Sequence, residues 1–155
     1  MNFLTFLMAV PQKIVLLVDD DFDDHLFFKF SLSEVTGNFD LKSIRDGQAA
    51  LDYFNDATKP VPDYIFLDIN MPVVNGFTCL QKMRKLPHMK DVATIIWTTS
   101  SREEDREEAR RLGATAFFTK PVGVEMLTTS LKFILGQSHM PGRYPEFEVE
   151  FFMAM

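Results

Sequence analysis

The 155-residue sequence contains one cysteine, Cys79, and therefore cannot form an internal disulfide bond. Nothing in its cysteine usage indicates an oxidising compartment. Long hydrophobic runs are also lacking. Residues 1–10 are apolar, but this run falls well short of the ~20 residues that span a bilayer. It also has no Lys or Arg before it, as a signal peptide would. We therefore expect a cytoplasmic protein without a membrane-inserted segment.

Basic residues are outnumbered, because 16 Lys and Arg stand against 22 Asp and Glu and give a net charge of −6. Binding to nucleic acid requires clustered positive charge, so we expect no direct contact with nucleic acid. Histidines are few as well. His25, His88 and His139 are scattered without the spacing of a transition-metal site. The class that remains is an ordinary globular domain, for which 46% hydrophobic and 25% charged residues are typical.

Short apolar runs alternate with segments of helical periodicity along the chain. The predicted strands are residues 14–18, 39–44, 64–67, 94–97 and 114–119, and the predicted helices are residues 22–35, 49–54, 77–86, 102–112 and 124–135. Five strand–helix alternations predict an α/β doubly wound domain with a five-stranded parallel sheet. This domain would cover residues 13–136, with an N-terminal extension at 1–12 and a C-terminal extension at 137–155.

Charged and hydroxyl side chains stand where the predicted strands end. Asp19 and Asp20 follow the first strand, Asp68 the third, Thr98 the fourth and Lys120 the fifth. The carboxyl ends of parallel strands meet in one crevice, so these side chains should lie together. Three close carboxylates repel each other unless a cation is present, and Mg²⁺ prefers such oxygen ligands. With a lysine to pair with phosphate, the cluster predicts phosphoryl transfer to a carboxylate.

Four runs, in this order, resemble the signature of the response regulator receiver domains of the CheY-like superfamily. They are residues 15–20 (VLLVDD), 68–76 (DINMPVVNG), 95–100 (IIWTTS) and 117–121 (FFTKP). The resemblance spans residues 13–136 and implies a flavodoxin-like fold with helices on both faces of the sheet. Within the superfamily, residues 46–47 (DG), 98–100 (TTS) and 104–105 (ED) are most similar to small stand-alone regulators that partner phytochrome-type sensor kinases.

The resemblance implies two groups of site residues. The first would hold Mg²⁺ and consists of the phosphoacceptor Asp68 with Asp19, Asp20 and Asn70, the last through its backbone carbonyl. The second would respond to the phosphoryl group and consists of Thr98, Lys120 and the switch aromatic Phe117. A cis peptide bond before Pro121 is also implied, because only proline permits that isomer at modest cost.

These implications describe a signalling protein of a two-component system or phosphorelay, and not an enzyme that turns over a separate substrate. It would accept a phosphoryl group from a sensor histidine kinase or a histidine phosphotransfer protein, and it would assist its own phosphorylation and dephosphorylation. We expect no DNA-binding output domain after the last helix, so output would be a contact with a downstream protein.

Two other functions fit these residues less well. A magnesium-dependent phosphatase of the haloacid dehalogenase type would also form an aspartyl phosphate, but it requires a second Asp two residues after the nucleophile, where Asn70 stands. An unphosphorylated pseudo-receiver that serves only as a binding module is disfavoured by the complete set of site residues.

Apolar residues also occur outside the expected core. In the first helix Phe22, Leu26 and Phe30 form a stripe opposite the sheet-facing residues, and the resemblance places the docking site of the kinase there. Residues 146–151 alternate glutamate with apolar side chains, which is typical of a strand with one apolar face. We expect the two terminal segments to cover each other, the domain or a second subunit in a homodimer. A disordered C-terminal tail is the alternative.

Overall fold

The computed structural model describes residues 2–5 and 10–155. Its strands are β1 (Lys13–Val18), β2 (Phe39–Ile44), β3 (Tyr64–Leu67), β4 (Ala93–Thr98), β5 (Ala116–Thr119), β6 (Gly142–Tyr144) and β7 (Val149–Phe151). Its helices are α2 (Phe22–Ser33), α3 (Gly47–Asn55), α4 (Gly76–Met83), α5 (Glu103–Arg111), α6 (Val124–Gly136) and the short 3₁₀ helix η1 (Pro145–Phe147). All ten predicted elements are present, and no end is shifted by more than three residues. None of the described helices is long and apolar enough to cross a bilayer.

The strands form one sheet in the order β2-β1-β3-β4-β5-β7-β6. The five expected strands are parallel, whereas β7 runs antiparallel to β5 and β6 antiparallel to β7. The prediction of five strands is therefore wrong in its count, because the sheet has seven. The added hairpin pairs with β5, which would otherwise be an open edge with unpaired backbone groups.

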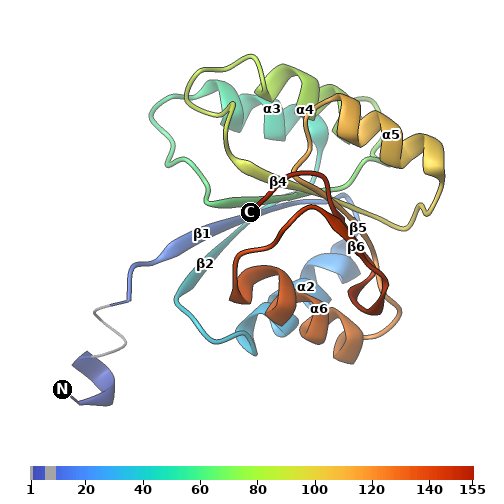
Figure 1. The fold of residues 1–155 in the computed structure, drawn as a ribbon. Coiled ribbons are helices and arrows are strands. Elements are labelled where there is room, and N and C mark those ends of the chain that lie inside the picture. Colours follow the sequence, from blue (N-terminus) through green and yellow to red (C-terminus); the bar gives the residue numbers. More distant parts are fainter. Residues whose placement is uncertain (1, 6–9) are drawn as a thin grey trace.

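Helices cover both faces of the sheet (Figure 1). Helices α2 and α6 lie on one face, and α3, α4 and α5 lie on the other. Strand β1 shows why, because it is apolar at every position of its buried part and alternate side chains point to opposite faces. Val15 and Leu17 pack in the same cluster as Phe28 of α2. Leu16 and Val18 pack in the cluster that contains Leu51 of α3.

The C-terminal segment is ordered against the domain. Val149 and Phe151 of β7 are buried, and the ring of Phe147 stacks on that of Phe133 of α6 with 4.0 Å between centroids. This confirms the expectation that the segment covers the domain, and the disordered tail is wrong. At the other end of the chain Phe3 is exposed. Leu4 is exposed as well, whereas Met1 and residues 6–9 of that segment lie outside the described part.

Candidate functional site

The hydrogen-bond ladders of the sheet extend past the strand ends and position the site residues. The Asp19 N–H donates to the Ile44 carbonyl at 3.0 Å, and the Asp68 N–H donates to the Val18 carbonyl at 2.9 Å. The Lys120 N–H donates in the same way to the Thr98 carbonyl at 2.7 Å. Each functional residue is therefore the first residue after a strand, with its backbone still tied to the neighbouring strand.

Three carboxylates meet at this edge of the sheet. One oxygen atom each from Asp19, Asp20 and Asp68 lies within 4.8 Å of the other two. Asp19 and Asp68 are buried, whereas Asp20 is exposed. Hard oxygen donors at this separation fit a divalent ion of the size of Mg²⁺ or Mn²⁺. The predicted convergence of these three residues is therefore what the fold produces.

Lys120 reaches into the same cluster. Its Nζ lies 2.8 Å from Oδ2 of Asp19, 2.7 Å from Oδ2 of Asp24 and 3.6 Å from Oδ2 of Asp68. The ammonium thus neutralises part of the negative charge of the carboxylates around it. Asp24 was not predicted as a site residue. It stands in the first turn of α2, where an acidic residue is ordinary because it favours the helix N-terminus, so the sequence carries no distinct signal for it.

The acidity of the cluster depends on burial and on Lys120. Burial raises the pKa of Asp68 to about 6, although the charge of Lys120 acts in the opposite direction. Burial also acts to raise the pKa of Asp19, but hydrogen bonds from Lys120 and from the Asp21 N–H outweigh it, so that pKa is lowered. The pKa of Lys120 is raised because its bonds to Asp19 and Asp24 outweigh the effect of burial. Asp68 is therefore the easiest of the buried site carboxylates to protonate.

The hydroxyl of Thr98 is linked to Asp68 through Asn70. It accepts hydrogen bonds from Nδ2 of Asn70 at 3.3 Å and from the Ser100 N–H at 3.1 Å. The Asn70 N–H in turn donates to Oδ1 of Asp68 at 3.1 Å. Asn70 is exposed, so the edge of the site that it forms beside Asp68 is accessible to solvent. The structure thus brings Asn70 and Thr98 together with Asp68, as expected.

Glycine is required next to Asp68. Asn75 caps α4 by accepting the Thr78 N–H, and Gly76 begins the helix directly against the backbone of Asp68. A Cβ at Gly76 would lie 2.2 Å from the carbonyl oxygen of Asp68. The Asn-Gly pair of the motif therefore lets α4 start close to the end of β3.

Phe117, which the resemblance names as the switch aromatic, lies in the core of the domain. Phe117 is buried with the guanidinium of Arg106 4.7 Å above its ring. It lies in the core cluster of the α3, α4 and α5 face.

No cis peptide bond occurs in the described ranges, so the bond before Pro121 is trans and the expected isomer is wrong. The two isomers of an X–Pro bond differ by only about 0.5–1 kcal/mol, too little for the sequence to decide.

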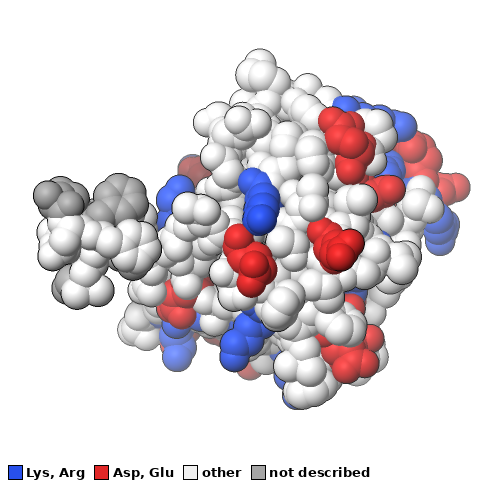
Figure 2. Space-filling model, turned by 90° about the horizontal axis from the view of Figure 1, so that it is seen from below, with Lys and Arg blue, Asp and Glu red and all other residues white. Residues whose placement is uncertain are grey.

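The apolar stripe of α2 is exposed as predicted. Phe22, Leu26 and Phe30 have 55%, 49% and 57% of their surface accessible, and the adjacent Phe27 has 50%. Figure 2 views the face formed by α2 and α6, where uncharged atoms cover a broad area between separate charges. Phe27 was missed because the helical spacing of the stripe does not include it.

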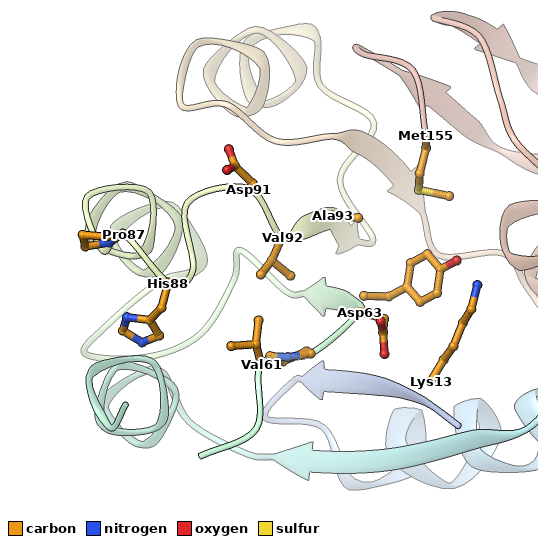
Figure 3. Close-up of a pocket in the computed structure, with 11 residues that line it drawn as sticks. Lys13, Val61, Asp63, Pro87, His88, Asp91, Val92, Ala93 and Met155 are labelled. Carbon is orange, nitrogen blue, oxygen red and sulfur yellow. The ribbon is translucent and has the colours of Figure 1, made fainter. Parts of the chain in front are cut away.

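A separate pocket lies at the opposite ends of the strands (Figure 3). Its volume is about 500 Å³, and Lys13 of β1, Tyr64 of β3 and Ala93 of β4 line it. These are the first residues of their strands, whereas Thr98 is the last residue of β4 and Asp19 and Asp68 directly follow the last residues of β1 and β3. The volume of a pocket therefore does not identify the functional site of this protein, whereas the convergence of three carboxylates does.

Comparison with known proteins agrees with this geometry. Residues 15–132 match the family described as the response regulator receiver domain. The response regulator Rcp1 of Synechocystis is 30% identical over 114 residues, which are 71% of this chain and 78% of Rcp1. Protein PilH of Pseudomonas aeruginosa is 31% identical over 121 residues, 77% of this chain and 96% of PilH. The sensor histidine kinase CheAY of Helicobacter pylori is 31% identical over 119 residues, but these are only 14% of that protein.

Solved structures show the same fold. The Mn²⁺-bound form of Rcp1 superposes with a TM-score of 0.72 at 28% identity, covering 79% of this chain and 91% of that one. The phosphorylated cyanobacterial phytochrome response regulator RcpA gives 0.73 at 26% identity, covering 80% and 91%. The family match covers most of the chain and includes the strand ends that carry the carboxylates. This chain therefore belongs to the response regulator receiver family, with the α/β flavodoxin-like fold of CheY-like signalling proteins.

Proposed function

We propose that this receiver accepts a phosphoryl group on Asp68 with the help of Mg²⁺ bound beside it. The observation that carries the proposal is the convergence of Asp19, Asp20 and Asp68 within 4.8 Å, with the Lys120 ammonium 3.6 Å from Asp68. A buried carboxylate between a metal site and a fixed cation is the arrangement that phosphoryl transfer to an aspartate requires.

In this reaction an oxygen of the ionised Asp68 attacks the phosphorus of a phosphohistidine. The O–P bond forms as the P–N bond breaks, and the imidazole nitrogen leaves with the electron pair. Burial raises the pKa of Asp68 to about 6, so the carboxylate is still mostly ionised at neutral pH. Its side chain is only 6% exposed, so the donor must approach from the open side of the crevice, above Asn70.

The metal would be held by Asp20 and Asp68 directly, by the backbone carbonyl of Asn70, and by Asp19 mainly through water. When bound it would supply charge neutralisation for the phosphoryl oxygens. Lys120 would contribute the second positive charge, since its contact with Asp68 already places it next to the acceptor. Thr98 would donate a hydrogen bond from its hydroxyl to a phosphoryl oxygen, because that hydroxyl only accepts in its two contacts here.

The donor would be a sensor histidine kinase or a histidine phosphotransfer protein that docks on Phe22, Leu26 and Phe30. This stripe begins in the first turn of α2, three residues after Asp19. A partner helix packed against it would bring a phosphohistidine to the same end of the sheet as Asp68. Rcp1 and RcpA are both response regulators, and RcpA is a phytochrome response regulator by name. We propose a phytochrome-type kinase as the donor of this chain on that likeness.

The test is labelling with acetyl phosphate and Mg²⁺, which needs no partner protein. The protein should gain one acid-stable, base-labile phosphoryl group, and Asp68→Asn should abolish it because an amide is a poor nucleophile. Asp23→Asn is the matched control, since Asp23 is an exposed carboxylate in the first turn of α2. Labelling of Asp68→Asn at the level of the unmodified protein would contradict the assignment.

A further inference from the structure

Trp97 is the only tryptophan of the chain, and its polar atom is turned toward the metal site. Its Nε1–H donates a hydrogen bond to Oδ2 of Asp19 at 2.8 Å. The residue precedes Thr98 on β4, and the two side chains point to opposite faces of the strand. Trp97 is 2% exposed and Asp19 is fully buried, so no solvent competes for this bond.

The same carboxylate oxygen also receives Lys120, whose Nζ lies 2.8 Å away. The remaining oxygen of Asp19 accepts the Asp21 N–H at 2.8 Å. Both oxygens of Asp19 are thus engaged by protein donors, and Lys120 lies over the indole ring at 5.2 Å from its centroid. Asp19 is therefore held as a fixed negative charge and is not free to swing toward or away from a cation.

The indole is itself clamped. The ring of Phe28 meets it edge-on at 5.6 Å, and the ring of Phe118 lies at 5.3 Å. Buried aromatic neighbours on two sides leave one ring orientation, and in it the N–H points at Asp19. Residues that hydrogen-bond to a metal ligand fix the orientation of that ligand and thereby change the affinity for the metal. The indole N–H of Trp97 stands in this relation to Asp19.

We propose that Trp97 is a positioning residue of the metal site, which sets divalent-ion affinity by fixing Asp19 through its indole N–H. This inference rests on the proposed function, because it assumes that Mg²⁺ binds at the carboxylates. Trp97 itself does not touch the ion or the phosphoryl group. Its effect passes through Asp19 and, through the shared oxygen, reaches Lys120.

The test separates the effect of the indole N–H on Mg²⁺ affinity from the effect of the packing of the ring. Benzothienylalanine incorporated at position 97 keeps the shape of the indole and replaces the N–H by sulfur. Mg²⁺ affinity measured by calorimetry should fall about tenfold, which is the usual size of an outer-group effect. The melting temperature without metal should change far less than in Trp97→Phe, which also removes ring contacts.

Leu131→Ala is the matched control, because it removes a fully buried side chain of α6 from the same core cluster and leaves the two aromatic neighbours of the indole in place. It should lower stability and leave Mg²⁺ affinity unchanged. The single indole N–H resonance in NMR provides a second readout. It should be protected from hydrogen exchange, move when Mg²⁺ is added, and lose its protection in Asp19→Asn.

The outcomes distinguish the two proposals. If the unmodified protein binds no Mg²⁺, the proposed function fails. If it binds Mg²⁺ and the benzothienylalanine protein binds within twofold of the same affinity, the function stands and the role of Trp97 is overturned. A tenfold loss in Leu131→Ala would also overturn it, because a general loss of core packing would then be enough to lower the affinity.

Discussion

The carboxylate of Glu150 lies 3.3 Å from the guanidinium of Arg106 and joins the C-terminal strand β7 to helix α5. Glu150 also contacts Arg110 at 3.1 Å and Arg143 at 3.3 Å. Its side chain is buried, so these partners replace water. Arg106 in turn covers the ring of Phe117. The terminal hairpin is thus tied by charge to the element that follows Thr98 and Ser100.

Replacing Glu150 by Gln should therefore destabilise the fold. The change leaves Arg106 without its carboxylate at a partly buried position, and breaking a buried pair costs more than the pair contributes. We expect the free energy of unfolding, measured in urea, to fall by about 1–3 kcal/mol. Glu146→Gln, at an exposed position of η1, should change it by less than about 0.5 kcal/mol. Equal effects of the two changes would mean that the contacts with α5 carry no stability.

Asp68→Asn should stabilise the metal-free protein at neutral pH. Its pKa is raised from 3.8 to about 6 in the fold, so the stability linked to this group is complete below the unfolded pKa of about 4. That stability is lost as pH rises to 6, and it stays absent above. The amide cannot ionise and avoids this loss, so the gain at pH 7.5 should be roughly 1–3 kcal/mol, at about 1.4 kcal/mol per pKa unit.

The measurement is urea unfolding of both proteins with a metal chelator at pH 7.5 and pH 4.5. The difference between them should shrink at the lower pH, because Asp68 is then mostly protonated in the folded state and resembles the amide. A difference that stayed constant between the two pH values would show that the carboxylate is not perturbed in the fold.

Lys120→Met should tighten Mg²⁺ binding while it slows phosphorylation. The change removes a positive charge that lies 2.8 Å from Asp19 and 3.6 Å from Asp68, and the methionine keeps much of the side-chain volume. A more negative cluster attracts a cation more strongly, so the dissociation constant should fall severalfold. Asp20→Ala should have the opposite effect on Mg²⁺, because it removes an oxygen ligand. Parallel losses of Mg²⁺ affinity in both variants would show that these roles are wrongly divided.

Leu26→Glu should block docking without harming the site. Leu26 is half exposed on the apolar stripe of α2, so a charge there costs little stability and disrupts an apolar contact. Transfer from the cognate histidine kinase should fail, whereas labelling by acetyl phosphate and the melting temperature should persist. Val61→Glu, an equally exposed apolar position before β3, should leave transfer intact. Loss of folding in Leu26→Glu would mean that the stripe is core.

The site was largely predictable because its residues stand directly after apolar runs. A parallel sheet places the carboxyl ends of its strands together, so Asp19, Asp68 and Lys120 had to converge once the strands were recognised. Apolar runs at Val15–Val18 and Ile65–Leu67 leave no other arrangement that buries both faces of a strand. The contact of Asp24 with Lys120 could not be predicted, because an acid in a first helical turn has an ordinary role there.

The sequence by itself determined the five strand–helix alternations, the place of Asp68 at the end of the third strand and the apolar stripe of α2, since each depends on spacing within a short segment. Only the tertiary structure decided that β7 pairs with β5, because an alternating strand can pair with any open edge. It also decided that Glu150 meets Arg106 and that the indole of Trp97 faces Asp19, 78 positions away along the chain. Such contacts depend on the packing of several elements at once, and no local pattern in the sequence records them.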